Sequence, residues 1–181
     1  MSKPSSFSTI CTSNCAIELV GLLLSLSVFH PDETIYVLCD TKTKRIIDTM
    51  TPRPKLQIKW FIELDKYDGM NRQMMEQNGL FGNFLLNKMK IMKYVLRDYK
   101  DTLFLDSDII IVNAIQDIDR TKQVGLSPQF IQKKHLDITG YYNAGLLWTN
   151  SIDICDYWES IINYTNHCPE QINMTQLRKY S

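Results

Sequence analysis

The stretch from residue 102 to residue 112, TLFLDSDIIIV, limits the possible folds more than any other part of this sequence. Continuous apolar residues are typical of a strand that is buried on both faces, and residues 103–105 and 109–112 show this pattern on either side of the acids. We therefore expect Asp106 and Asp108 to lie at the end of a buried strand.

Two carboxylates in this position repel one another unless a cation lies between them. Mg²⁺ and Mn²⁺ both prefer oxygen ligands, so the spacing of Asp106 and Asp108 suggests a divalent metal site. The alternative is a turn in which the two side chains accept hydrogen bonds from backbone amides.

The chain has 181 residues, of which 44% are hydrophobic and 22% are charged, and this fits a single globular domain over residues 1–181. Its 20 basic and 20 acidic residues cancel, so no overall field attracts nucleic acid or an anionic membrane. We expect neither partner.

The cysteines and the longest apolar segment both indicate in which part of the cell the protein works. Five cysteines, an odd number without metal-ligand spacing, argue against a disulfide framework and favour a reducing, cytoplasmic compartment. Residues 19–29 are apolar, but a bilayer span needs about twenty such residues, so a buried helix is the better interpretation.

The apolar patterns alternate between strand and helix through the first 112 residues. They predict strands at 7–11, 34–39 and 56–64, helices at 15–29, 43–50 and 84–99, and a long polar connection at 65–82. Later patterns predict strands at 124–127 and 141–148, a loop at 128–140, and helices at 152–164 and 169–178. The alternation indicates an α/β fold with a mostly parallel sheet flanked by helices.

Ligands of such a fold bind at the carboxyl ends of the strands. Residues 12–14, Asp40 and residues 106–108 all follow predicted strands, so they should meet at this edge, which favours the metal site over the turn. Lys88 is the charged member of an otherwise apolar helix stripe, and it either points toward this edge or extends its amine to solvent.

Four segments together resemble a known family: CTSN at 11–14, LFLDSDI at 103–109, YYNAGL at 141–146 and PEQ at 169–171. They are similar to nucleotide-sugar glycosyltransferases of the GT-A fold, in particular to family 8, which includes glycogenin and bacterial lipopolysaccharide galactosyltransferases, and to small transferases of large DNA viruses, which would act in the host cytoplasm. The resemblance implies a Rossmann-like domain with a nucleotide-binding half at 1–112 and a sugar and acceptor half at 113–181.

For the donor, the resemblance implies that Asp106 and Asp108 hold Mn²⁺ or Mg²⁺ against the diphosphate, with Ser107 beside them and Lys88 adding a positive charge. A divalent cation suits this reaction, because the leaving nucleoside diphosphate gains negative charge. The donor would be a UDP-sugar such as UDP-glucose or UDP-galactose, and the acceptor a glycan or a protein.

The first loop would bind the nucleotide. Thr12, Ser13 and Asn14 would bond the base and ribose, although the same residues could simply cap the following helix. Asp40 could bond a ribose hydroxyl, and a plain turn or cap is its alternative role.

The sugar pocket would come from the later segments. Tyr142, Asn143 and Gly145 would shape it, unless they form an ordinary strand bulge. Glu170 and Gln171 match the acidic-Gln pair that lies near the reacting carbon in the family; outside that family they would be an ordinary helix start.

The sequence departs from the family at the third metal ligand, which is often a histidine beyond the acidic-Gln pair. Neither His135 nor His167 matches its place, and the sequence given ends at Ser181. We therefore expect weak donor retention, with slow hydrolysis or low activity. The alternatives are a phosphatase of the haloacid-dehalogenase type, which also has a D-x-D strand end, and a nucleotide-sugar-binding module without catalysis.

Overall fold

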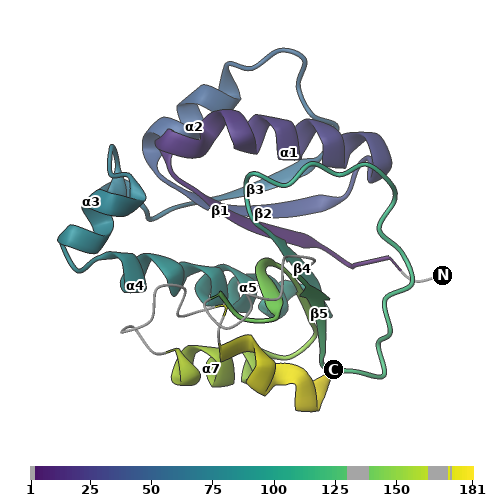
Figure 1. The fold of residues 1–181 in the computed structure, drawn as a ribbon. Helices are drawn as coiled ribbons and strands as arrows, with labels where there is room; N and C mark the ends of the chain where they lie inside the picture. Colours follow the sequence, from purple (N-terminus) through teal and green to yellow (C-terminus); the bar gives the residue numbers. More distant parts are fainter. Residues whose placement is uncertain (1–2, 130–138, 163–170, 172) are drawn as a thin grey trace.

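The computed structural model describes residues 3–129, 139–162, 171 and 173–181 (Figure 1). The strands are β1 (Phe7–Cys11), β2 (Thr34–Cys39), β3 (Gln57–Ile62), β4 (Thr102–Leu105), β5 (Val124–Pro128) and β6 (Tyr142–Thr149). The α-helices are α1 (Ala16–Phe29), α2 (Thr41–Asp48), α3 (Arg72–Gln77), α4 (Phe81–Leu85), α5 (Asn87–Asp98) and α7 (Ile152–Ile161). The 3₁₀ helices of the described residues are η1 (Ser13–Cys15), η2 (Asp65–Tyr67) and η3 (Asn173–Tyr180).

The described strands form one six-stranded sheet in the order β3-β2-β1-β4-β6-β5. The pairs from β3 to β4 are parallel, whereas β6 runs antiparallel to both β4 and β5. The predicted α/β class with a mostly parallel sheet is thus confirmed. Because β6 runs in the opposite direction, its first residues lie at the edge where β1, β2 and β4 end.

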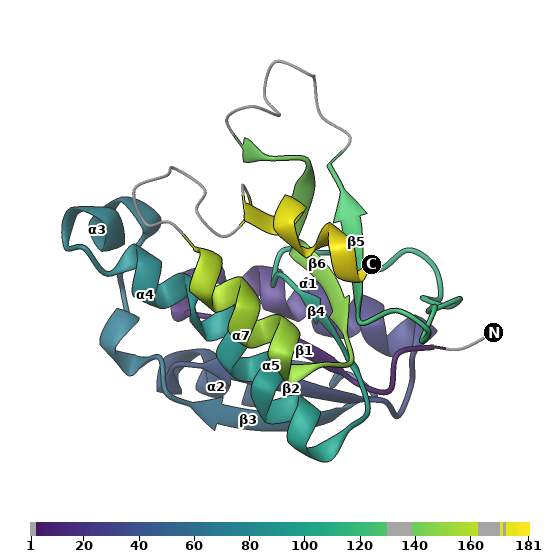
Figure 2. The same cartoon turned by 90° about the horizontal axis from the view of Figure 1, so that it is seen from below.

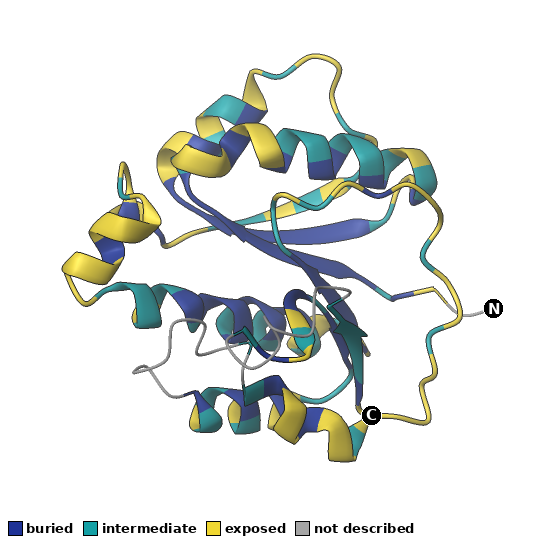
Figure 3. Cartoon of the chain, in the orientation of Figure 1, coloured by how far each residue is buried: buried dark blue, intermediate teal, exposed yellow. Residues whose placement is uncertain are grey.

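Helices cover both faces of the sheet. Figure 1 shows α1 and α2 on one face and α5 and α7 on the other. A separate apolar cluster lies under each pair of helices, and β1, β2 and β4 are buried along their whole length, as their dark blue colour in Figure 3 shows. This burial explains why these strands lack the polar alternation of β3, which is at one edge of the sheet.

The prediction of strand structure at 109–112 was wrong. After β4 the chain leaves the sheet and lies along α1, where the Ser25 hydroxyl accepts a hydrogen bond from the Ile111 amide (3.0 Å) and His30 Nε2 accepts one from the Ile115 amide (2.9 Å). Ile111 is buried beside α1, whereas Ile110 and Val112 are 56% and 82% exposed. The apolar side chains therefore reflect packing on a helix and not pairing in the sheet.

Two other expectations need correction. The connection at 65–82 contains η2, α3 and the start of α4, and the predicted C-terminal α-helix is the 3₁₀ helix η3. Within the described ranges, no helix is long and apolar enough to cross a membrane, and the apolar helix α1 has 14 residues.

Candidate functional site

Asp106 lies directly beyond β4, in the middle of the sheet. Its backbone amide donates to the Gly145 carbonyl (2.8 Å), which extends the pairing of β4 with β6 by one residue. Lys88 from α5 reaches the Asp106 carboxylate, with its Nζ atom 2.9 Å from Oδ1. The Lys88 side chain is only 7% exposed, so its charge is compensated by this contact and by the Ala144 carbonyl at 3.4 Å. Lys88 is thus directed into the site and not toward solvent.

Gly145 permits the close approach of β6 to Asp106. A Cβ atom at this position would lie 2.4 Å from Asp106 Oδ2 and 3.1 Å from Asn143 Oδ1. The Asn143 side chain accepts a hydrogen bond from the Gly145 amide (2.8 Å). The start of β6 therefore places the Asn143 amide group beside the Asp106 carboxylate.

The loop after β1 is supported from behind by Asp40. Cys11 and Cys39 are register partners, so β1 and β2 end side by side. One oxygen of Asp40 accepts from the Ser13 amide and the other from the Thr43 amide, both at 2.6 Å, and Asp40 is completely buried. The structure therefore shows Asp40 as a helix cap, which was the alternative to a ribose contact. Its side chain caps α2 and fixes the loop that carries Ser13.

The same loop faces the acidic pair. The buried thiol of Cys11 lies beneath the loop and donates to the carbonyls of Thr12 (3.2 Å) and Cys15 (3.3 Å). Burial raises the pKa of this thiol, and the neighbouring Ser107 partly opposes the rise. Partial burial, then the nearby carboxylates of Glu18, Asp108 and Asp106, raise the pKa of the Cys15 thiol. Asn14, Cys15 and Asp108 are thus exposed to solvent on the same part of the surface.

Two further residues approach this edge without any signal in the sequence. Asp68, beyond η2, accepts a hydrogen bond from the Ser13 hydroxyl at 2.6 Å, although 55 residues separate them. Asp65 likewise accepts from the amide (2.6 Å) and the hydroxyl (3.0 Å) of Thr41. The connection predicted as polar therefore contacts the loop proposed for nucleotide binding.

The remaining predicted residues lie near the start of β6 or outside the described part of the chain. Tyr142 is the first residue of β6, and the Gln171 side chain donates to the Thr139 carbonyl just before it (2.7 Å). Glu170, His135 and His167 are outside the described residues.

The carboxylates of Asp106 and Asp108 have the chemistry to hold a hard divalent ion. Among the described residues, no group of three or more His, Cys, Asp or Glu side chains could hold a metal. Of the described residues, this pair would supply two ligands to an ion here, with phosphate oxygens and water as further ligands. Two side-chain ligands plus substrate phosphates suit Mg²⁺ or Mn²⁺ better than a cage made only of protein groups.

Several glycosyltransferases of known structure have the same fold. The chain aligns with GlyE of Streptococcus pneumoniae TIGR4 (TM-score 0.62, 14% identity, 99% of this chain and 44% of that one). It also aligns with the apo structure of WbbM, a bifunctional glycosyltransferase (TM-score 0.60, 13% identity, 98% of this chain and 38% of that one). A third alignment is with the apo structure of mouse xyloside xylosyltransferase 1 (TM-score 0.53, 10% identity, 97% of this chain and 75% of that one).

This chain spans less than half the length of the GlyE and WbbM chains. No protein-family model matches the sequence, and no curated protein matches it either. The similarity establishes the fold, which is that of these glycosyltransferases, as the resemblance in the sequence implied.

Proposed function

We propose that this protein is a metal-dependent glycosyltransferase that moves a hexose from a nucleoside diphosphate sugar, UDP-glucose or UDP-galactose, to a glycan or protein acceptor. The observation that carries the proposal is the position of Asp106. It lies at the carboxyl end of a central strand, with Lys88 behind it and Asn143 beside it. The membership of family 8 that the four segments suggest is part of this proposal.

Each group has a chemical task in this reaction. A Mn²⁺ or Mg²⁺ ion held by Asp106 and Asp108 would stabilise the negative charge that develops on the leaving diphosphate. Lys88 holds Asp106 in place and adds a buried positive charge on the same side. The loop at 12–14 would bind the nucleotide, and Asn143 would orient hydroxyls of the transferred sugar.

The fold favours this activity over the phosphatase of the haloacid-dehalogenase type, because GlyE, WbbM and mouse xyloside xylosyltransferase 1, which align with 97% or more of the chain, are glycosyltransferases. A binding module without catalysis would share both the fold and the loop. Turnover therefore has to be measured in addition to binding.

The test compares the wild type with Asp108→Asn, and with Asp117→Asn as the matched control. Asp117 is exposed and has a positive φ of 65°, which asparagine tolerates well, so the control removes the same charge without strain. UDP binding is measured by thermal shift with and without MnCl₂, and UDP release from UDP-glucose and UDP-galactose by a coupled assay.

We expect manganese to strengthen UDP binding to the wild type and to Asp117→Asn. Asp108→Asn should weaken the manganese-dependent binding by about tenfold or more, a change of roughly 1.4 kcal/mol. The transferase proposal fails if neither manganese nor Asp108 affects UDP binding. Binding without any UDP release would instead identify a non-catalytic module.

A further inference from the structure

A small pocket lies between the start of β6 and η3. Its volume is about 220 Å³, and its walls are Tyr141, Tyr142, Thr175 and Arg178. Pockets for drug-sized ligands measure roughly 300–1,000 Å³, so this one has room for a single sugar unit. In Figure 2 the yellow C-terminal helix η3 lies beside β5 and β6.

The geometry of η3 explains why Thr175 and Arg178 line the pocket together. In a 3₁₀ helix, side chains three residues apart are eclipsed. Met174 and Leu177 form one such row and are completely buried against the sheet, which fixes the orientation of the helix. Thr175 and Arg178 form the next row and are exposed.

The aromatic wall is also held in place. The rings of Tyr141 and Tyr142 meet edge to face, with their centroids 5.0 Å apart, and Tyr141 is 50% exposed. Gln129 binds the backbone of both residues, donating from its amide to the Tyr141 carbonyl (2.8 Å) and from its side chain to the Tyr142 carbonyl (3.0 Å). The two rings therefore form a fixed corner.

The pocket begins one residue before Asn143, which lies beside Asp106. A ligand in the pocket would thus lie at the same edge of the sheet as the place where the transferred sugar is expected. This makes it a candidate for the second substrate of a transfer reaction.

We propose that this pocket is the acceptor subsite, and that it binds a pyranose that carries a carboxylate or phosphate group. The inference rests on the proposed transferase function. The apolar C–H face of a pyranose can pack on the tyrosine rings, while their hydroxyls and the Thr175 hydroxyl can bond sugar hydroxyls. The planar guanidinium of Arg178 matches the paired oxygens of a carboxylate or phosphate, which a neutral sugar lacks.

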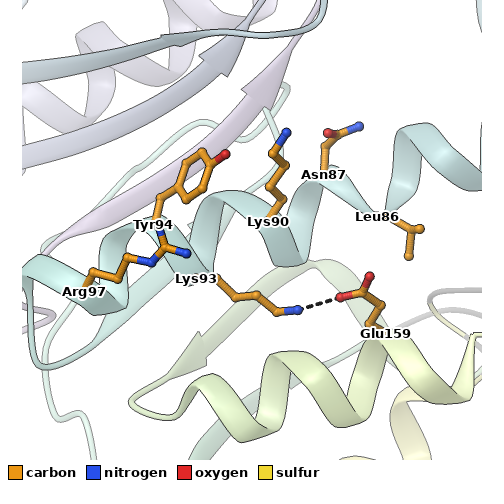
Figure 4. Close-up of a pocket in the computed structure, with 7 residues that line it drawn as sticks. All are labelled: Leu86, Asn87, Lys90, Lys93, Tyr94, Arg97 and Glu159. Atoms are coloured by element: carbon orange, nitrogen blue, oxygen red, sulfur yellow. Dashed lines mark hydrogen bonds and ion pairs between the residues drawn. The ribbon is translucent and has the colours of Figure 1, made fainter.

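A second pocket provides an internal comparison. It has a volume of about 260 Å³ and lies on α5 and α7, where Tyr94 and Arg97 form part of its wall (Figure 4). The Arg97 guanidinium lies 5.4 Å from the centre of the Tyr94 ring, so this pocket also combines a tyrosine with an arginine. Its Lys93 forms ion pairs with Asp156 (2.5 Å) and Glu159 (2.6 Å), which would compete with an anionic sugar.

The experiment measures the binding of D-glucuronate, glucose 6-phosphate and glucose to the full chain by calorimetry or ligand-observed NMR. The variants are Arg178→Met and Tyr141→Ala, with Arg97→Met as the matched control from the other pocket. We expect the two anionic sugars to bind about tenfold more tightly than glucose. Arg178→Met should remove this preference, Tyr141→Ala should weaken all three sugars, and Arg97→Met should change neither property.

The acceptor assignment is overturned if glucose binds as well as glucuronate and glucose 6-phosphate, or if the preference depends on Arg97 and not on Arg178. UDP binding with manganese, measured on the same samples, separates this failure from that of the proposed function. If UDP binds normally to every variant but Arg178→Met retains the preference, only the acceptor subsite is wrong. If the sugars bind through Arg178 but UDP does not bind at all, the transferase function is wrong.

Discussion

At the scale of single residues, Gly145 determines how closely β6 can approach Asp106. The hydrogen bond between the Asp106 amide and the Gly145 carbonyl brings the two backbones together, and the Asp106 side chain then occupies the space where a Cβ atom would stand. The ion pair with Lys88 (2.9 Å) holds the carboxylate in this position. The requirement for glycine is therefore steric, and it arises from the site itself.

Gly145→Ala should displace the Asp106 carboxylate and abolish manganese-dependent UDP binding. The added methyl group should also lower the free energy of unfolding by about 1–3 kcal/mol, the usual cost of overpacking. Urea denaturation and UDP thermal shifts measure the two effects.

Gly125→Ala on the neighbouring strand β5 is the control for this change. A Cβ atom there would meet the Trp148 side chain at an ordinary 3.5 Å, so stability and UDP binding should be nearly unchanged. Equal effects of the two substitutions would show that the crowding at Asp106 has no functional consequence.

At the scale of elements, the segment from 109 to 115 connects the acidic pair to α1. Ser25 and His30, both on the α1 side, accept hydrogen bonds from backbone amides of this segment. His30 is the residue that ends α1, and it is only 4% exposed. The chain that leaves Asp108 is thereby fixed to a helix and is independent of the sheet.

The His30 contact should make stability depend on pH. Burial, which outweighs the attraction of Glu33, lowers the pKa of His30 below its usual value of 6.5. The neutral ring accepts a hydrogen bond from the Ile115 amide, so His30 stabilises the fold fully at pH values above the pKa that it has in the unfolded chain. This stabilisation is lost as the pH falls from there through the lower pKa of the folded protein. We expect the unfolding free energy of the wild type to decrease between pH 7.5 and pH 5 more than that of His30→Gln.

Chemical denaturation at several pH values measures this difference. The glutamine carbonyl can still accept a hydrogen bond, and it does not titrate. Because His135 and His167 are present in both proteins, their contributions cancel in the comparison. Parallel pH profiles for the two proteins would contradict the role of His30.

The elements that the sequence predicts well are those whose environment is uniform along their length. The strands at 7–11, 34–39 and 103–105 are buried throughout and contain no charged residue, and the helix stripe with Lys88 as its charged member correctly indicated the face that meets Asp106. Residues 109–112 are also apolar, but they pack on a helix surface, and composition does not distinguish a sheet from a helix as the packing partner.

The site could be predicted only in part, for a related reason. The carboxyl ends of parallel strands meet at one edge, so residues 12–14, Asp40 and Asp106 could be grouped from the strand order alone. The contact of Ser13 with Asp68 depends on how a long connection folds back, and no periodic pattern describes that path.

At the scale of the whole molecule, Asp101 and Arg120 join three segments that are distant in the sequence. The buried Asp101 carboxylate accepts from the Ser5 amide (2.7 Å) and from Arg120 Nε (2.8 Å). Arg120 also donates to the Lys3 carbonyl at 2.6 Å. Burial opposes the charge of Asp101, but the hydrogen bonds from Ser5 and Arg120 outweigh it and lower the pKa of Asp101. The chain before β1, the start of β4 and the segment before β5 are thereby linked.

Arg120→Met should destabilise the protein by about 1–3 kcal/mol, because it removes a partner from a buried carboxylate. Arg72→Met, which breaks an exposed pair with Glu76 within α3, should cost less than about 0.5 kcal/mol. Urea denaturation at pH 7 measures both. If Arg120→Met lowers the free energy of unfolding no more than Arg72→Met does, the contact between Asp101 and Arg120 is not important for stability.

Because β6 runs antiparallel to β4, the register of its first residues is as important as their identity. A slip of one residue against β4 would bring Ala144 or Leu146 opposite Asp106, and either side chain would collide with the carboxylate. The same slip would withdraw Tyr142 from the corner next to Arg178. A one-residue insertion or deletion within the first residues of β6 would therefore disable both proposed substrate positions together.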